Sequence, residues 1–298
     1  MINKNKVKID LPLVQRLVRK QFPQWANLTI KPVESSGWDN RTFHLGSDMI
    51  VRLPSNSVYA SQVQKEQYWL PKLAPELPLA IPKPVAMGKP ATEYPWHWSI
   101  YQWLDGQTVT ASYISDINLF AQSLAKFLKA LQQCDATGAP SAGPDNFYRG
   151  GDLSIYDADT RKALAQIDDK KLSDALRVIW EKALSSSWQY APVWIHGDIA
   201  VGNLLVNKGE LVAVIDFGQL AIGDPACDLA MYWTFLSGLS GAMFRDSLDL
   251  DSDTWDRGRG WVLWKTLCAP IVGTDCNKIL NEIIADFNLS SGSEHHGN

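Results

Sequence analysis

Hydrophobic residues in the first third of the chain follow two helical patterns and several short strand-like runs. Apolar positions three and four residues apart, preceded by Asp10 as an N-cap, predict a helix over residues 11–22. A second helix is expected from Ser61 to about Leu70, where Pro71 leaves its continuation open. Short aliphatic and β-branched runs predict mostly antiparallel strands at 28–33, 42–45, 49–53, 85–88 and 98–104.

From Asp116 onward the apolar residues adopt the spacing of helices. Helices are predicted over 116–131, 158–166, 171–186, 225–236, 255–267 and 277–287. Three short apolar runs predict strands at 193–196, 204–206 and 211–216. The loop 135–154 is too long for a plain connection, so we expect it to be functional or mobile. The Ser, Gly and His residues of 291–298 predict a flexible tail.

The change from strand to helix patterns falls near Asp105–Gly106 and divides the chain into two parts. A chain of 298 residues can bury a large core and often folds as two lobes. We therefore expect an α+β protein, with a sheet-containing lobe over residues 1–105 and a larger, mainly helical lobe over 106–290.

The composition is that of a folded globular protein, with 46% hydrophobic and 20% charged residues. A net charge of −4 argues against a dedicated nucleic-acid binder, which would normally be basic. The sequence contains no apolar run long enough for a signal peptide or a membrane span. We expect a soluble, cytoplasmic protein without membrane or nucleic-acid partners, and the sequence leaves its oligomeric state open.

Charge is unevenly distributed between the two parts. Residues 1–106 contain 13 Lys and Arg against 8 Asp and Glu, a net of +5, whereas residues 107–298 contain 15 against 24, a net of −9. Two interpretations stay open at this point. The lobes could bind ligands of opposite charge, or the solvated faces could differ by chance.

One stretch, residues 196–228, concentrates the residues that carry chemistry. It contains His-Gly-Asp-x-x-x-x-Asn, then Asp-Phe-Gly, then Gly-Asp-Pro-x-x-Asp. The predicted strands place Asp198 and Asn203 on one loop and Asp216 at the end of the next strand. Phosphoryl transfer uses such a set, because one carboxylate orients the acceptor hydroxyl while Asn and Asp oxygens hold Mg²⁺ on the phosphates. Neither a Walker A motif nor a zinc-protease or serine-hydrolase motif competes with it.

With these motifs the chain resembles the aminoglycoside phosphotransferase family, the small-molecule branch of the protein-kinase-like fold. That family also includes macrolide, choline, homoserine and fructosamine kinases. The resemblance implies a bilobal kinase-like fold, ATP or GTP as the phosphate donor, and Mg²⁺. It also implies that Asp198 is the catalytic base, that Asn203 and Asp216 are metal ligands, and that His196 and Asp228 support the catalytic loop.

The resemblance extends into the first lobe. Residues 100–106 resemble the hinge of the family, where the carbonyl of Gln102 and the N–H of Leu104 would hydrogen-bond adenine. The helix around Glu66 resembles the one whose glutamate pairs with the phosphate-binding cation.

Two departures from the family pattern concern the phosphates. Residues 35–40 stand in place of a Gly-rich loop, with Ser36 as the candidate phosphate contact. Arg52 stands where the family pattern has Lys, and its planar guanidinium alters the geometry of a phosphate contact. The first interpretation is an active small-molecule kinase; the alternative is a nucleotide-binding pseudokinase with a regulatory role.

The acceptor is expected to be a small molecule with a hydroxyl group, such as an aminoglycoside, amino sugar, macrolide or choline-like compound. Acidic residues between two late helices favour a cationic acceptor, and a nearby Trp could offer a flat ring. A solvated loop and core packing are the alternative interpretations of these residues. The candidate substrate-binding residues are Asp249, Asp251, Asp253 and Trp255.

Overall fold

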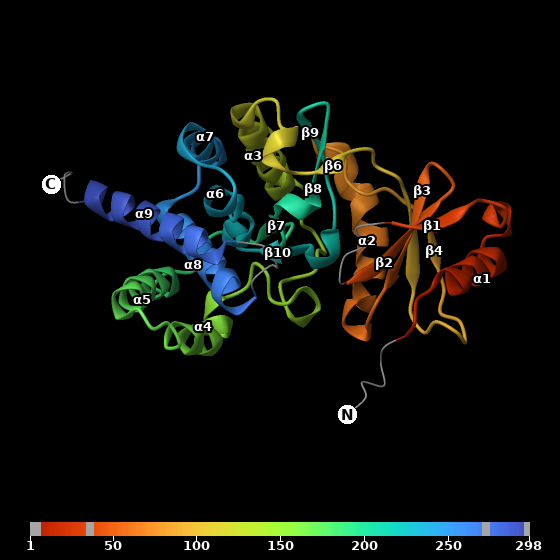
Figure 1. Cartoon of the computed structure of the whole chain (residues 1–298), viewed down its shortest axis with the longest axis horizontal. Coiled ribbons are helices and arrows are strands. Elements are labelled where there is room, and N and C mark those ends of the chain that lie inside the picture. Colours follow the sequence, from red (N-terminus) through yellow and green to blue (C-terminus); the bar gives the residue numbers. More distant parts are fainter. Residues whose placement is uncertain (1–6, 34–38, 270–274, 295–298) are drawn as a thin grey trace.

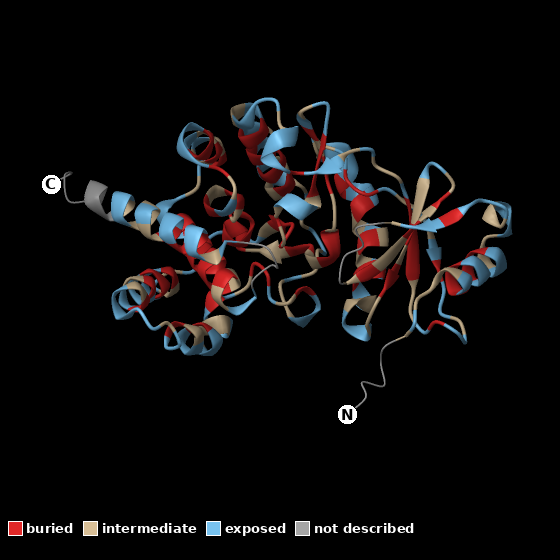
Figure 2. Cartoon of the chain, viewed as in Figure 1, coloured by how far each residue is buried: buried red, intermediate tan, exposed pale blue. Residues whose placement is uncertain are grey.

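The protein folds into two lobes with separate hydrophobic cores, and residues 103–106 link the last strand of the N-terminal sheet to the larger lobe (Figure 1). The computed structural model describes residues 7–33, 39–269 and 275–294. One core lies under the N-terminal sheet, and the larger one fills the helical lobe, where buried residues gather on facing sides of the helices (Figure 2). The α+β fold with a sheet lobe and a larger helical lobe is confirmed.

The N-terminal lobe is an antiparallel sheet of five strands in the order β1-β2-β3-β5-β4. The strands are short, and the edge strand β4 leaves Val85 and Met87 exposed. The strands are β1 (Ile30–Pro32), β2 (Asn40–Leu45), β3 (Met49–Pro54), β4 (Pro84–Gly88) and β5 (Trp98–Gln102). Helix α1 (Leu11–Gln21) begins at Asp10, whose carboxylate accepts from the N–H of Leu13 as predicted. Its apolar face packs on the sheet.

Helix α2 (Ala60–Leu73) passes between the sheet and the larger lobe. It continues through Pro71 to Leu73, past the predicted end near Leu70. Leu70 and Leu73, on either side of the proline, are buried in the core of the larger lobe. Their burial compensates for the backbone hydrogen bond that proline cannot donate.

The larger lobe contains two small sheets that surround the catalytic loop. Strand β7 (Val193–Ile195) pairs with β10 (Ala221–Gly223), and β6 (Gln107–Thr108) pairs with β8 (Leu204–Asn207), which pairs with β9 (Glu210–Val214). Because β7 and β8 flank residues 196–203 and β9 ends just before Asp216, the predicted motif residues meet at one edge.

The remaining helices form the body of the larger lobe. Those that match predicted segments are α3 (Ile117–Gln133), α4 (Asp157–Leu164), α5 (Lys170–Leu184), α8 (Ser252–Cys268) and α9 (Cys276–Glu294). Residues 291–294, expected to lie in a flexible tail, continue α9, and residues 295–298 lie outside the described part. Within the described ranges, no helix is both long and apolar enough to cross a membrane.

The predicted helix over 225–236 is wrong. That segment forms a 3-10 turn at Pro225–Asp228 and the short helix α6 (Met231–Thr234), because the side chain of Asp228 turns back to the catalytic loop. The sequence analysis also missed helix α7 (Gly238–Leu248). Its Gly and Ser residues favour a loop locally, but Phe244 and Leu248 anchor it in the core against α3.

The proline inside α2 gives a test of how this helix is stabilised. Replacing this exposed proline with alanine restores a donor for the helical ladder, so Pro71→Ala should stabilise the fold by about 1–3 kcal/mol. Thermal unfolding of this variant, with the exposed Gln64→Ala as control, measures the effect. An unchanged or lower Tm for Pro71→Ala would show that the helix is adapted to the proline.

Candidate active site

The catalytic loop is held by one buried carboxylate. Asp228 accepts hydrogen bonds from the backbone N–H groups of His196 (2.7 Å) and Gly197 (2.8 Å). Gly197 has a φ of +83°, and a Cβ there would lie 2.8 Å from the carbonyl oxygen of Gln219, so only glycine fits this turn. Burial raises the pKa of Asp228, while the His196 and Gly197 N–H groups oppose that shift. The predicted supporting position of Asp228 matches this geometry.

His196 joins the catalytic loop to the next strand. Its Nε2 lies 3.0 Å from the carbonyl oxygen of Ile215, and its ring packs edge-on against Phe217. The side chain is fully buried, so it supports the loop from the protein interior and does not face the cleft.

The two polar ends of the loop are tied together. The Nδ2 of Asn203 donates to the backbone oxygen of Asp198 (2.8 Å) and to its carboxylate Oδ2 (3.2 Å). The backbone oxygen of Asn203 in turn accepts from Ile215, the residue before Asp216. These contacts fix Asp198, Asn203 and Asp216 relative to one another.

Asp216 follows β9 in a left-handed conformation, with φ and ψ both 66°. Such a conformation is uncommon for a residue other than glycine and is often found at functional sites. It turns the carboxylate toward Arg52, whose NH2 lies 2.7 Å from Oδ1.

Arg52 on β3 bridges the two lobes. Its NH1 lies 3.6 Å from the Glu66 carboxylate on α2, while its NH2 contacts Asp216 on the other lobe. The side chain is only 13% exposed, and Tyr101 also hydrogen-bonds Glu66. Burial raises the pKa of Glu66, while the charge of Arg52 opposes this rise. The structure therefore brings Arg52 and Glu66 together with Asp216, the arrangement expected for a phosphate-binding cation.

Helix α2 also contacts the Asp-Phe-Gly segment directly. The Nζ of Lys65 donates to the backbone oxygen of Gly218 at 2.8 Å. The side chain of Gln62 packs so closely against Gly218 that a Cβ there would lie 2.6 Å from its Oε1. Burial lowers the pKa of Lys65 to about 8.

The hinge residues lie where the sheet ends. The N–H of Gln102 donates to Lys83 and that of Trp103 donates to Asp48, which leaves Leu104 as the first residue beyond these sheet contacts. The roles predicted for the Gln102 carbonyl and the Leu104 N–H stay predictions. Ser36, the candidate phosphate contact, lies outside the described residues.

Two cations near Asp198 were missed by the sequence analysis. The Nζ of Lys265, on α8, lies 2.5 Å from Oδ1 of Asp198. Burial alone would raise the pKa of Asp198, but Lys265, His196 and Arg149 outweigh it, so the pKa is lowered. Lys265 could have been noticed as a lone charge within the apolar run Trp-Val-Leu-Trp-Lys-Thr-Leu.

The second cation, Arg149, lies on the long loop 135–154. Asn146 Nδ2 donates to the backbone oxygens of Arg149 (2.8 Å) and Gln219 (3.2 Å), and Arg149 Nε donates to the Gln219 side chain (2.9 Å). A Cβ added at Gly197 would lie 3.1 Å from the Cβ of Arg149, so the two residues are in close contact. The loop therefore holds Arg149 against residues 196–203.

The candidate substrate-binding residues do not gather at Asp198. Trp255 is 1% exposed and packs against Trp233 and other core rings, so the prediction that it offers a ring face to substrate is wrong. Asp251 caps α8, Asp249 ends α7, and Asp253 lies 4.0 Å from Lys182. Twelve residues of helix separate Asp253 from Lys265, a distance of about 18 Å along the axis.

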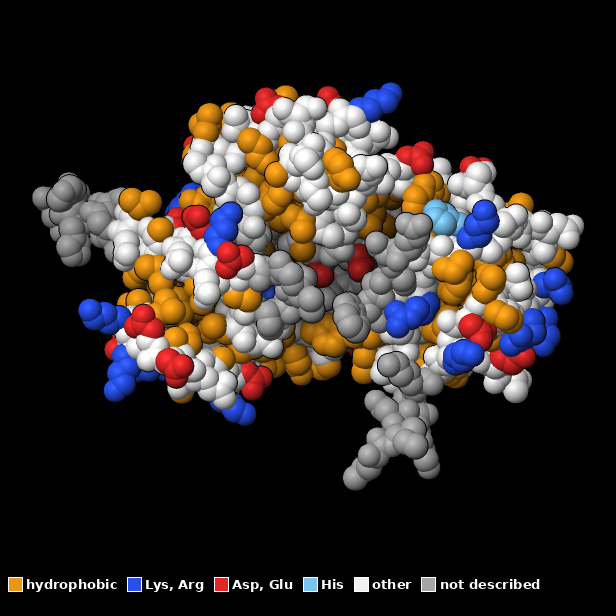
Figure 3. Space-filling model, viewed as in Figure 1, with side chains coloured by type: hydrophobic (Ala, Val, Ile, Leu, Met, Phe, Trp, Pro, Cys, Tyr) orange, Lys and Arg blue, Asp and Glu red, His pale blue; other side chains and the backbone are white. Residues whose placement is uncertain are grey.

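A third carboxylate faces the cleft from the N-terminal lobe. Asp39 precedes β2, and its backbone oxygen accepts from Ser55. Burial and the charge of Asp216 raise the pKa of Asp39 to about 6, while a hydrogen bond with Tyr59 opposes the shift. Acidic side chains line the hollow between the two lobes in Figure 3.

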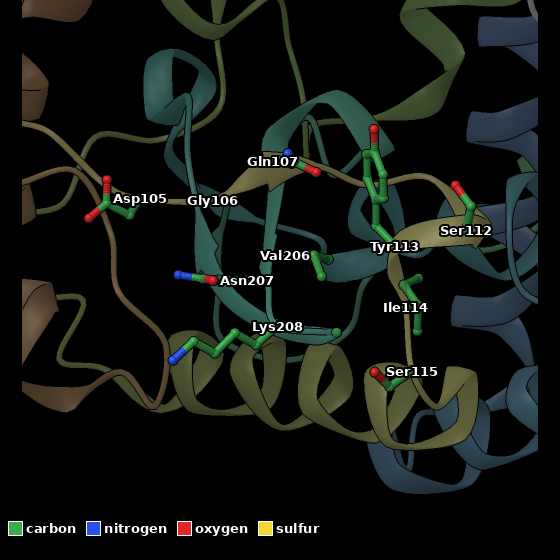
Figure 4. A pocket seen from close by; sticks show the side chains of 11 residues that line it. Asp105, Gly106, Gln107, Ser112, Tyr113, Ile114, Ser115, Val206, Asn207 and Lys208 are labelled. Carbon is green, nitrogen blue, oxygen red and sulfur yellow. The ribbon is translucent and has the colours of Figure 1, made fainter.

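A surface depression with a volume of about 770 Å³ lies elsewhere. It is bounded by the hinge end at Asp105–Gly106, by Tyr113 and by the β8–β9 turn with Lys208 (Figure 4). The depression lies at the C-terminal end of β8, whereas Asn203 lies directly before the N-terminal end of that strand. None of the predicted site residues lines it, so we assign the chemistry to the cleft at Asp198.

The comparison with known families agrees with the geometry of this cleft. Residues 29–261, which include Arg52, Asp198, Asn203 and Asp216, match the model of the phosphotransferase enzyme family. The chain belongs to this family. Within it, an aminoglycoside 3'-phosphotransferase of Escherichia coli is 24% identical over 151 residues, or 49% of this chain and 55% of that protein. The chain thus spans about half the length of the curated relatives it matches.

Solved structures of other phosphotransferases share the fold. The GDP complex of aminoglycoside 2'-phosphotransferase-IIIa aligns with a TM-score of 0.73 at 20% identity, covering 94% of this chain and all of that one. A macrolide 2'-phosphotransferase from Brachybacterium faecium aligns with a TM-score of 0.58 at 21% identity, covering 96% and 94%. At these identities the likeness shows the protein-kinase-like fold that the sequence predicts.

The raised pKa of Asp39 predicts how the stability of the protein depends on pH. A carboxyl with a folded-state pKa near 6 favours folding while protonated, and this contribution is lost as pH rises through 6. Asp39→Asn keeps a neutral group at all pH values. Thermal unfolding with EDTA and without nucleotide should give a Tm advantage of Asp39→Asn that grows from about pH 4 to about pH 7 and is constant at higher pH.

The matched control is Asp48→Asn, at an exposed turn residue. A Tm difference between Asp39→Asn and the wild type that does not change with pH would contradict the assignment.

Proposed function

We propose that the protein transfers the γ-phosphate of a nucleoside triphosphate to a hydroxyl group of a small molecule. The observation that carries this proposal is the meeting of Asp198, Asn203 and Asp216 with Arg52 in one cleft between the lobes. These side chains come from the catalytic loop, the Asp-Phe-Gly segment and β3, three segments far apart in the chain.

Asp198 would orient the acceptor hydroxyl and take its proton. The lowered pKa keeps this side chain ionised at neutral pH, as an acceptor of that hydrogen bond must be. As the O–H bond breaks, the acceptor oxygen forms a bond to the γ-phosphorus. The bond from the γ-phosphorus to the β,γ-bridging oxygen breaks, and the nucleoside diphosphate leaves with that electron pair.

The donor would be held by the N-terminal lobe and the hinge. Arg52 would contact the phosphates, Glu66 would keep its guanidinium in place, and the Gln102 carbonyl and Leu104 N–H would bind the base. ATP and GTP both fit these roles.

The residues present fit Mg²⁺. Asp216 offers a carboxylate, and Asn203, whose Nδ2 is engaged by Asp198, offers its amide oxygen. Such hard oxygen donors suit an ion that takes its other ligands from water and phosphate, and the described residues contain no larger metal-binding cluster. When bound, Mg²⁺ would neutralise charge on the phosphates.

A regulatory pseudokinase is not favoured by this arrangement. In that alternative Arg52 would mark a lost phosphate site, yet it occupies the space between Glu66 and Asp216. The acceptors named for the relatives, aminoglycosides and macrolides, are the first compounds to test, and drug resistance would follow only from transfer to such a compound.

The role of Asp198 can be tested by removing its charge alone. Asp198→Asn should lower kcat by at least about 1,000-fold while Mg²⁺–nucleotide binding persists, since the base acts on the acceptor and not on the donor. Release of nucleoside diphosphate measures turnover, and fluorescence or calorimetry measures binding.

The exposed Asp174→Asn, on α5, is the matched control and should retain full activity. Wild-type turnover in Asp198→Asn would refute the assigned base. Nucleotide binding without turnover in the wild type, across a broad acceptor panel, would favour the pseudokinase.

A further inference from the structure

We propose that the acceptor carries an anionic group, a carboxylate or a phosphate, which binds Lys265 and Arg149 beside the catalytic Asp198. This inference rests on the proposed phosphotransferase activity and names the chemical class of its substrate. It reverses the expectation of a cationic acceptor that the acidic residues between α7 and α8 suggested.

Lys265 occupies the position next to the catalytic carboxylate. Its Nζ lies 2.5 Å from Oδ1 of Asp198, whereas Oδ2 faces Asn203 at 3.2 Å. Both carboxylate oxygens are therefore engaged by protein donors. An acceptor hydroxyl must displace or share one of these contacts, and a second anion beside Lys265 would draw the ammonium toward itself and free Oδ1.

Arg149 adds a second fixed positive charge on the same side. It is 9% exposed, and its guanidinium carbon lies 4.5 Å from the ring centre of Trp264 and 5.6 Å from that of Trp261. Stacking on an indole and the hydrogen bond to Gln219 hold the plane of the guanidinium, and its charge lowers the pKa of Asp198. A fixed guanidinium suits bidentate contact with a carboxylate or phosphate.

Helix α8 presents these groups on one face. Trp261, Trp264 and Lys265 are spaced three and four residues apart, so they face the same side. The charged group that this face turns toward Asp198 is the Lys265 ammonium, which is a donor, whereas an ammonium group of an acceptor molecule requires hydrogen-bond acceptors.

Carboxylates nearby on the larger lobe are already engaged. Asp224 is paired with the buried Arg257 at 2.6 Å, and Asp228 accepts from the catalytic loop. Asp216 is paired with Arg52. A polycationic acceptor would therefore meet Lys265 and Arg149 as like charges at the point where its hydroxyl must approach Asp198.

The test compares anionic and cationic acceptors on the intact protein. Gluconate and glycerate represent carboxylates, glucose 6-phosphate represents phosphates, and glucose and kanamycin are the neutral and cationic comparisons. Binding is followed by thermal shift and by tryptophan fluorescence with Mg²⁺ and a non-hydrolysable nucleotide, and transfer by mass spectrometry of the product. We expect an anionic compound to bind at least about 10-fold more tightly than glucose and kanamycin.

Variants assign that preference to Lys265 and Arg149. Lys265→Gln and Arg149→Gln should each raise the KM for the anionic acceptor by about 10- to 100-fold with a smaller change in kcat, and Lys265→Arg should restore much of the affinity. Lys265→Glu should shift preference toward kanamycin. The exposed Lys278→Gln on α9 is the matched control, and nucleotide binding by each variant shows that it is folded.

Different outcomes separate the two proposals. Efficient transfer to kanamycin with a KM that is unchanged in Lys265→Gln would overturn the anionic acceptor and leave phosphoryl transfer intact. Tight binding of no anion in the panel would also count against it. A wild-type protein that binds no Mg²⁺–nucleotide and transfers phosphate to no acceptor would overturn the proposed function itself.

Discussion

A single buried guanidinium joins the two lobes of this protein. Arg52 extends from the N-terminal sheet between Glu66 on α2 and Asp216 on the larger lobe. Strand β3, helix α2 and the Asp-Phe-Gly segment meet at this one charge. Removing one member of a buried ion pair typically costs about 3–5 kcal/mol. This ion pair, the contact of Lys65 with Gly218 and the burial of Leu70 and Leu73 together set the relative placement of the three elements.

A second buried charge, the carboxylate of Asp228, holds the candidate catalytic loop from the protein interior. The carboxylate of Asp228 holds the backbone on either side of the His196–Gly197 bond, which sets the direction in which Asp198 leaves the loop. The two charges have complementary roles in the proposed reaction. Arg52 would define the donor side of the cleft, and Asp228 would fix the proposed base on the acceptor side, where Lys265 and Arg149 add the positive charge.

Sequence patterns predicted the parts of this structure that are encoded locally. The strands of the first lobe, the capped helix α1 and the His-Gly-Asp-x-x-x-x-Asn and Asp-Phe-Gly segments each carry their signal within about twenty residues. The family pattern also pointed to Arg52 as the candidate phosphate-binding cation, and the structure shows its contact with Asp216. The net positive charge of the first lobe has a candidate explanation in the proposed donor site, which would bind the negatively charged phosphates.

Contacts between distant segments were beyond the reach of these patterns. Lys265 lies 67 residues from Asp198, and nothing in the local sequence of α8 indicates which way its side chain points. Trp255 and Trp264 occur on the same helix, but tertiary packing buries the first in the core and places the second under Arg149. Helix α7 was missed because its local propensity is weak and its anchoring residues contact α3, far away in the chain.

Equilibrium binding of Mg²⁺–ATP to Arg52 variants tests the central claim most directly. Isothermal titration calorimetry on the wild type, Arg52→Lys and Arg52→Gln measures the donor site without depending on the acceptor, and circular dichroism shows whether each variant is folded. The account predicts that a folded Arg52→Gln binds on the order of 100-fold more weakly, while Arg52→Lys stays within about 10-fold of the wild type. Equal affinities for wild type and Arg52→Gln would contradict it.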